Sequence, residues 1–234
     1  MRVPPPPTVD ALRISAVVPV LDEARVLEGR LRALAAEVDE LIVVDGGSRD
    51  GSPEIARACG ARVLAFPPGR GGQQAAGARA ARGELLWFVH ADAAIPAGSG
   101  QALRTAAGTR PWGCFEVDLQ SADPRLRFTA WWMNRRAALT GSCTGDMALW
   151  LRRDFYEALG GFATLPAFED LDLSDRARRR SPPALLRPAI GVDPRRWEGR
   201  GVNRTILRLW ALRAAWRLGL PPARLATLYR DRVR

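Results

Sequence analysis

The sequence predicts an α/β protein in which a mainly parallel sheet is covered by helices on both faces. Short runs that are apolar throughout recur along the first half of the chain, which is typical of strands buried on both sides. Segments with apolar residues at helical spacing separate these runs, and this alternation indicates a parallel sheet. With 234 residues, 47% of them hydrophobic, the chain is long enough for one such domain with an appendage.

The predicted elements alternate along residues 14–89. We expect strands at residues 14–18, 41–44, 62–66 and 85–89, and helices at residues 23–36, 52–58 and 73–82. Pro53 in the first turn and Gly60 after the last turn mark the limits of the helix at 52–58. Beyond Asp92 the alternation weakens. There we expect helices at residues 124–139, 155–159, 170–180 and 203–218.

These elements suggest three parts: a Pro-rich flexible N-terminus at residues 1–11, an α/β domain at 12–200 and a basic helical C-terminal extension at 201–234. The charge is uneven. Residues 1–175 hold 19 arginines and 22 acidic residues, whereas residues 176–234 hold 16 arginines and 3 acidic residues. A basic end of this kind suggests an anionic neighbour, which is a phosphate, a lipid headgroup or a nucleic acid.

The compartment predicted from the sequence is the cytoplasm. The three cysteines form no CxxC pair, which argues against a disulfide scaffold or a zinc cluster. The N-terminal residues have no apolar core of a signal peptide, and we expect no membrane span.

Polar motifs follow the first two predicted strands. The first strand ends in Val-Pro-Val-Leu-Asp-Glu at 18–23, and the second in Val-Asp-Gly-Gly-Ser-Arg-Asp-Gly-Ser at 44–52. Asp45 comes directly after its strand, where its carboxylate is placed to accept hydrogen bonds from a base or a ribose. The alternative for this motif alone is an ordinary Gly-rich turn with Ser52 as the helix N-cap.

The next two motifs suit phosphate and a cation. Residues 69–79 place Arg70 and backbone N–H groups at a helix start, which suits a diphosphate, although a Gly-rich helix entry is the simpler alternative. The strand at 85–89 leads into His90-Ala-Asp92. Two such side chains, two residues apart, point the same way and could hold Mg²⁺ or Mn²⁺ against a diphosphate, with Asp92 the better candidate. A structural role is the alternative for His90.

In this order the motifs VPVLDE, VDGGSRDGS, GRGGQQAAGA and HAD resemble those of the family-2 glycosyltransferases. Gly145-Asp146, Gly160-Gly161-Phe162, Phe168-Glu169-Asp170 and Arg195-Arg196-Trp197 follow in the family's order. The resemblance spans residues 14–200 and implies a Rossmann-like GT-A fold. The Arg-Arg-Trp-Glu segment and the Trp-rich tail are most similar to the radical-SAM/selenodomain-associated, or arsenosugar-type, transferase 2 subgroup.

The resemblance also implies roles for single residues. Asp170 is the general base and Glu169 its neighbour; Asp92 and His90 hold a divalent cation. The residues implied for nucleotide-sugar binding are Pro19, Glu23, Asp45, Gly47, Ser48, Arg70, Asp92, Arg196 and Trp197. The residues implied for the acceptor side are Gly145, Asp146 and Trp132. Displacement at an anomeric carbon requires such a base opposite the leaving diphosphate. Acids that merely favour a helix N-terminus are the alternative for Glu169 and Asp170.

Three departures from the family pattern stand out. His90 replaces the first aspartate of the DxD element, Met147 replaces the glutamine of GDQ, and no glutamine precedes Arg195-Arg196-Trp197 at the family's spacing. Because this glutamine is missing, a plain basic surface is the alternative to a role of Arg196 and Trp197 in nucleotide-sugar binding.

The sequence therefore predicts a metal-dependent inverting glycosyltransferase of hexosyltransferase type, with a nucleotide-diphosphate sugar as donor and a hydroxyl compound as acceptor. A sugar-phosphate nucleotidyltransferase is the nearest alternative, and it would need a GxGxR-type loop after the first strand. A nucleic-acid-binding module that uses residues 176–234 is the third hypothesis. It is disfavoured because it leaves the motifs at the strand ends unexplained.

Two further partners are left open, a second copy and an anionic membrane surface, which would place the protein at the inner face of the cell membrane. On a helical wheel of residues 203–218 an Arg-free stripe remains. It consists of Leu207, Trp210, Ala214 and Leu218. We expect this stripe to pack on the domain or on a second copy, with membrane contact as the alternative. For Trp131, Trp132 and Met133 we expect core packing, with a wall of the acceptor site or a dimer contact as the alternatives.

Overall fold

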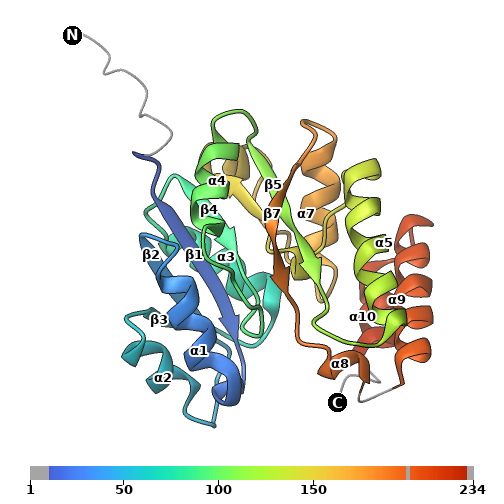
Figure 1. Cartoon of the computed structure of the whole chain (residues 1–234), viewed down its shortest axis with the longest axis horizontal. Helices are drawn as coiled ribbons and strands as arrows, with labels where there is room; N and C mark the ends of the chain where they lie inside the picture. Colours follow the sequence, from blue (N-terminus) through green and yellow to red (C-terminus); the bar gives the residue numbers. More distant parts are fainter. Residues whose placement is uncertain (1–10, 199–200, 231–234) are drawn as a thin grey trace.

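The computed structural model describes residues 11–198 and 201–230, and it contains one seven-stranded sheet flanked by helices (Figure 1). The strand order is β3-β2-β1-β4-β6-β5-β7. Strands β1, β2, β3 and β4 are parallel to one another, β6 is antiparallel to both of its neighbours, and β7 is parallel to β5. The predicted α/β fold with a mainly parallel sheet is confirmed.

The first half of the chain follows the predicted alternation. Its elements are β1 (Ile14–Val20), α1 (Ala24–Ala35), β2 (Glu40–Asp45), α2 (Ser52–Ala58), β3 (Arg62–Ala65), α3 (Arg70–Ala80) and β4 (Leu85–Phe88). Helix α3 begins three residues before its predicted start, so that Arg70 lies in its first turn.

Side chains alternate between the two faces of the sheet because successive residues of a strand point in opposite directions. In β1, Ile14, Ala16 and Val18 belong to the core with the helices on one face, whereas Val17 belongs to the core on the other. Helices α1 and α2 contribute to the first core and α3 to the second. Residues Leu27, Leu31 and Leu34 of α1 are almost fully buried. Burial of each of these leucines stabilises the fold by about 1.5–3 kcal/mol.

Helix α3 lies unusually close to the sheet at Gly77. A Cβ atom at this position would be 2.3 Å from Val17 Cγ1 and 3.1 Å from Val44 Cγ2. Only glycine leaves room for the helix at this depth. The close packing of α3 on β1 and β2 fixes the position of its N-terminal residue Arg70.

The second half contains elements that the sequence did not predict. Its elements are α4 (Ser99–Ala107), β5 (Trp112–Asp118), α5 (Pro124–Thr140), η2 (Gly145–Met147), β6 (Trp150–Arg152), α6 (Arg153–Ala158), α7 (Glu169–Arg178), β7 (Ala184–Gly191), α8 (Arg195–Glu198), α9 (Val202–Arg217) and α10 (Pro222–Arg230). Strand β6 has only three residues, and β7 contains Arg187 and Pro188 and is largely half-buried. Neither strand shows the apolar pattern that marks the first four.

The expected packing of the α9 stripe on the domain is wrong, whereas its packing on a second copy stays a prediction. All four residues of its Arg-free stripe are exposed, and the helix instead buries Val202 and Leu212, with Ile206 and Leu209 packed on the core. This expectation takes the side of the helix without arginines as the buried side. The criterion fails because Arg213 lies on the inner side of the helix and is itself largely buried. Core packing is also wrong for Trp131 and Trp132, which are 52% and 40% exposed, whereas Met133 is buried.

Helices α9 and α10 lie together beside α5, at the end of the molecule away from α1 and α2 (Figure 1). They form the described part of the predicted extension 201–234. Of the predicted flexible N-terminus, residues 1–10 lie outside the described residues. Within the described part of the chain, no helix combines the length and the apolar character needed to cross a bilayer.

Candidate active site

A cavity of about 770 Å³ opens where β1 and β4 end, and helices α5, α7 and α9 close its other side. A cavity at the carboxyl ends of parallel strands is the usual ligand site of an open α/β sheet. We divide it into two halves. The strand-end half is lined by residues that include Pro19, Glu23, Arg70, Gln73, His90, Asp92, Asp193, Arg195 and Trp197. The helical half is lined by residues that include Thr129, Met133, Arg136, Thr144, Asp146, Phe168, Glu169, Asp170, Leu209, Trp210 and Arg213.

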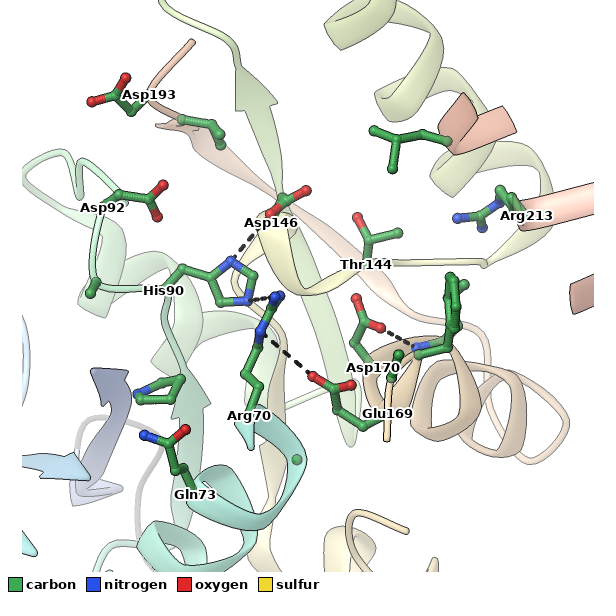
Figure 2. Close-up of a pocket in the computed structure, with 18 of the residues that line it drawn as sticks. Arg70, Gln73, His90, Asp92, Thr144, Asp146, Glu169, Asp170, Asp193 and Arg213 are labelled. Carbon is green, nitrogen blue, oxygen red and sulfur yellow. Dashed lines mark hydrogen bonds and ion pairs between the residues drawn. The ribbon is translucent and has the colours of Figure 1, made fainter. Parts of the chain in front are cut away.

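A row of three polar side chains joins the two halves (Figure 2). Arg70 Nη1 lies 3.4 Å from His90 Nε2, and His90 Nδ1 lies 3.2 Å from Asp146 Oδ1. These two partners assign the tautomer of His90. Its Nδ1–H donates to the Asp146 carboxylate, and its Nε2 accepts from the Arg70 guanidinium. Both ring nitrogens of His90 are thus occupied, so this side chain positions Arg70 and Asp146 relative to each other.

Three carboxylates, of Glu23, Asp92 and Asp193, line the strand-end half. The pKa of Glu23 is raised, first by burial and then by the negative charges of Asp92, Asp50 and Asp193. Asp193 is partly neutralised by Arg195 at 2.5 Å. Excess negative charge on oxygen ligands suits Mg²⁺ or Mn²⁺.

The same residues limit how such a cation would be held. Within residues 11–198 and 201–230, no three His, Cys, Asp or Glu side chains lie close enough together to form a metal site. Mg²⁺ in phosphate sites typically takes one or two carboxylates and completes its shell with phosphate oxygens and water. The strand-end half therefore fits a cation that binds together with a diphosphate.

Helix α7 places Glu169 and Asp170 at the cavity wall. Asp170 Oδ2 accepts from the Gly145 N–H at 2.6 Å, and Oδ1 accepts from the Leu171 N–H at 2.8 Å. These two bonds fix the direction of the carboxylate. Phe168, which precedes the pair, has a left-handed backbone with φ of +66°. Such strain in a non-glycine residue is typical of functional sites.

Glu169 is only 5% exposed, and its Oε1 lies 3.8 Å from Arg70 Nε. Burial raises the pKa of Glu169, and the charge of Asp170 raises it further, while Arg70 opposes the shift. Gly145 makes this arrangement possible. A Cβ atom on Gly145 would lie 2.7 Å from His90 Nε2 and 3.2 Å from Asp170 Oδ2, so η2 passes between them only with glycine at this position.

The loop at residues 45–52 lies behind the strand-end half rather than in its lining. Asp45 accepts from the N–H groups of Gly47 and Ser48, at 3.0 and 3.1 Å, and so closes its own turn. The hydroxyl of Ser48 accepts from the Asp22 N–H at 2.9 Å, which ties this loop to the one that carries Glu23. In this structure the three residues support the cavity wall.

The remaining predicted site residues lie at different distances from the cavity. Trp197 is buried and lines it, and its neighbour Arg195 lines it too, whereas the side chain of Arg196 lies outside the described part of the structure. Trp132 lies outside the lining and is 40% exposed. Gly145 enters the site through its backbone.

Sequence reasoning missed several lining residues. Gln73 donates from Nε2 to the carbonyl oxygens of Val20 and Val44, at 3.0 and 2.8 Å, and thereby joins the ends of β1 and β2. Asp193 follows β7, so the strand-end rule would have found it had that strand been predicted. Arg136, Thr144 and Arg213 come from helices and a loop that carry no local signal, and nothing in the sequence distinguishes these two arginines from the others.

Comparison with known proteins supports the resemblance. Residues 15–109, from β1 through α4, match the family model described as Glycosyl transferase family 2. Searching the curated proteins gave no match. A mannosyltransferase from Pyrobaculum calidifontis, solved with GDP-Man and Mn²⁺, is 23% identical with a TM-score of 0.57, over 76% of this chain and 55% of that one. This chain thus spans little more than half of that protein.

Two further solved structures share the fold. Glucosyl-3-phosphoglycerate synthase from Mycobacterium tuberculosis, solved with Mg²⁺ and UDP, is 21% identical with a TM-score of 0.62, over 93% of this chain and 86% of that one. TarS 1–349 from S. aureus, solved with UDP-GlcNAc, is 19% identical with a TM-score of 0.59, over 76% and 57%. The predicted GT-A-like fold is confirmed.

Proposed function

We propose that this chain, which contains a family-2 glycosyltransferase segment, is a metal-dependent inverting enzyme that moves a hexosyl group from a nucleoside-diphosphate sugar to an acceptor hydroxyl. One observation carries the proposal: a single cavity joins the acidic strand-end half to the carboxylate of Asp170. The related structures with GDP-Man and Mn²⁺, with Mg²⁺ and UDP, and with UDP-GlcNAc support the donor class.

The strand-end half would bind the donor. Pro19 and Glu23 at the end of β1 form the wall for the nucleotide, and Arg70 at the start of α3 faces the cavity beside them. Asp92 would hold the divalent cation, which neutralises charge on the leaving diphosphate when it is bound. Gln73 and the loop at 45–52 keep the ends of β1 and β2 in place.

Asp170 would act as the general base. Its carboxylate takes the proton of the acceptor hydroxyl while the acceptor oxygen forms a bond to the anomeric carbon. The bond from that carbon to the diphosphate oxygen breaks on the opposite face, which inverts the configuration. The N–H groups of Gly145 and Leu171 hold the carboxylate in the orientation for this transfer.

Arg70 and His90 would position the reacting groups. Arg70 lies between Glu169 and His90, and Asp146 fixes the imidazole from the other side. This row keeps the positively charged side chain of Arg70 between the donor position and the base. The Arg70 guanidinium would thereby stabilise the negative charge that develops on the diphosphate.

A nucleotide panel tests the proposal. The protein is melted with UDP, GDP, dTDP or CDP, each with and without Mn²⁺. A ligand at about 100 times its Kd raises the free energy of unfolding by about 2.7 kcal/mol. We expect one nucleotide to raise the Tm, and only with Mn²⁺. If no nucleotide raises the Tm, the proposal is wrong.

A product assay separates the two candidate enzyme classes. We expect the sugar nucleotide that matches the stabilising base to yield nucleoside diphosphate on transfer. Release of pyrophosphate from a sugar phosphate and a nucleoside triphosphate would instead indicate the nucleotidyltransferase. The arsenosugar-type subgroup, the second copy and the membrane surface stay predictions beside this proposal.

A further inference from the structure

Two arginines face the cavity from the helical half without an acidic partner. Arg136 of α5 and Arg213 of α9 both line it, and neither takes part in a salt bridge with any residue that the structure describes. Their hydrogen bonds lead to neutral atoms: Arg213 donates to the Ser142 hydroxyl, and Arg136 Nη2 lies 3.5 Å from the Ser142 carbonyl oxygen. The helical half thus holds two arginines whose charges no salt bridge pairs, although Asp170 lies near them.

The surroundings disfavour these charges. The pKa of Arg213 is lowered to about 10, first by burial and then by the charges of Arg136 and Arg217, while Asp170 and Asp175 oppose the shift. Burial likewise lowers the pKa of Arg136. Bringing two such cations together costs folding free energy unless an anion compensates them. The stability of the fold therefore does not explain why Arg136 and Arg213 lie together.

Unsatisfied polar atoms occur at the same place. Among the residues that the structure describes, four buried side-chain polar atoms lack a hydrogen-bond partner, and two of them are Arg136 Nε and Thr144 Oγ1. Both residues line the helical half. A guanidinium N–H and a hydroxyl are donors that an oxyanion satisfies.

We propose that the helical half is a subsite for an anionic group of the acceptor, so that the acceptor class is an alcohol that carries a phosphate or a carboxylate near the hydroxyl that receives the sugar. Arg136, Arg213 and Thr144 bind the anion. This inference rests on the proposed function, because it places the acceptor beside Asp170.

The position of the arginines separates this subsite from the donor diphosphate. In Figure 2, Asp170 lies between the group of His90 and Asp92 and the side chain of Arg213. An anion held by Arg213 is thus on the far side of the base from the carboxylates that suit the cation. A guanidinium binds a phosphate or carboxylate through two parallel N–H bonds, which orients the acceptor as well as attracting it.

The anion has two possible sources, a small soluble molecule or a lipid headgroup. Trp210 lines the cavity, and its ring continues into an exposed aromatic row of Trp132, Trp131 and Phe128, with centroids 6.5, 6.4 and 5.5 Å apart. Such a row beside a basic subsite would suit the acyl chains of an anionic lipid. The test therefore has one arm for each source.

The experiment uses the full chain with Mn²⁺, once with and once without the nucleoside diphosphate that stabilises it. In the first arm, calorimetry compares glycerol 3-phosphate and glycerate with uncharged glycerol. In the second arm, co-sedimentation compares phosphatidylglycerol vesicles with phosphatidylcholine vesicles. We expect an anionic probe to bind in at least one arm and its neutral counterpart not to bind. If anionic and neutral probes do not differ in either arm, the inference is overturned.

Variants locate the binding. Arg136→Gln and Arg213→Gln should each weaken binding of the anionic probe by about tenfold or more, because a charge-assisted hydrogen bond is lost. Thr144→Val should weaken it less. Nucleotide affinity should stay within about twofold, since the donor lies elsewhere. Arg204→Gln removes an exposed charge from the same helix outside the cavity and should bind as wild type.

Melting the same variants separates a binding role from a structural one. Because each substitution removes a disfavoured charge, Arg136→Gln and Arg213→Gln should have the same Tm as wild type or a higher one. Variants that keep full affinity for the anionic probe, or that melt well below wild type, would contradict the inference. Loss of the nucleotide effect alone would instead contradict the proposed donor chemistry, since binding of the anionic probe is also measured without nucleotide.

Discussion

The two halves of the cavity are built in different ways, and their arginines are paired differently: Arg70 and Arg195 face carboxylates, whereas the arginines of the helical half form no salt bridge with the described residues. In the strand-end half, short loops after β1 and β4 and the first turn of α3 supply carboxylates and one arginine. In the helical half, α5, α7 and α9 come together from distant parts of the chain and supply two arginines around Asp170. Local sequence thus determines the first half, and tertiary packing determines the second.

The difference indicates a division of labour. The carboxylates of Glu23 and Asp92 suit a cation and the diphosphate that it carries, whereas two arginines without a salt bridge suit an anionic acceptor. Asp170 and the row of Arg70, His90 and Asp146 lie where the halves meet. Substitutions in one half should therefore change binding of one substrate only, and substitutions at the junction should change transfer.

The largest effect is expected for Asp170→Asn. The amide cannot take the acceptor proton, so the rate of sugar transfer should fall by about 10²–10⁴-fold, the usual contribution of a general base. Nucleotide affinity with Mn²⁺ should be unchanged, because the side chain keeps its size and lies away from the carboxylates of the strand-end half. The rate is measured as release of nucleoside diphosphate.

Asp154→Asn serves as the matched control. Asp154 is also in the first turn of a helix, but its side chain is 70% exposed and outside the cavity. The control should transfer sugar at the wild-type rate. Transfer by Asp170→Asn at a rate near wild type would show that the base lies elsewhere, and Glu169 would be the next candidate.

The second largest effect is expected for Asp92→Ala. Nucleotide affinity in the presence of Mn²⁺ should fall by about tenfold or more, because a carboxylate ligand of the cation is lost. Without Mn²⁺ the variant and the wild type should bind alike. Glu54→Ala, which removes a 72% exposed carboxylate, should show no effect. A variant whose affinity still responds fully to Mn²⁺ would exclude Asp92 as a ligand.

Much of the strand-end half could be predicted from the sequence. Buried parallel strands read as continuous apolar runs, and the residue after each run lies at the ligand edge of the sheet. This is why Asp92 was predicted at the site from the residues alone, as Arg70 was from its place at a helix start, whereas Pro19 and Glu23 were predicted through the family resemblance. Asp45 met the same rule, but its carboxylate closes its own turn, a choice that depends on the loop geometry.

The helical half was predictable only where a motif marked it. Glu169 and Asp170 were found through a motif, whereas Arg136 and Arg213 were not. Which face of an amphipathic helix is buried depends on what packs against it, and α9 buries the side that carries Arg213. Strands β6 and β7 escaped notice because one is short and the other is half-buried, so their apolar patterns are weak.

A third prediction concerns the close packing of α3, which carries Arg70, on the sheet below the strand-end half. Gly77→Ala should lower the free energy of unfolding by about 1–3 kcal/mol, because the added methyl group would overlap Val17. Gly29→Ala is the matched control, since a Cβ atom on Gly29 in α1 meets nothing within 4 Å. The control should stabilise the protein by about 0.4–1 kcal/mol. Urea unfolding measures both, and equal effects would contradict the close packing of α3.

The smallest effect is expected at the junction, for Glu169→Gln. Burial and Asp170 raise the folded-state pKa of Glu169 above its ordinary value of 4.5. The folded state therefore binds this proton more tightly than the unfolded state does. Stability from this group is complete below pH 4.5 and is lost as the pH rises through the folded-state pKa. Glutamine does not ionise, so the variant should not show this loss.

The measurement is the Tm of both proteins from pH 4.5 to 7.5. We expect equal values at the acid end and a higher Tm for Glu169→Gln at neutral pH, by about 2–4 °C, the shift that 1 kcal/mol produces in a domain of this size. The opposite sign would mean that the attraction of Arg70 outweighs burial. The Glu169 carboxylate would then stay ionised as a partner of Arg70 throughout the reaction.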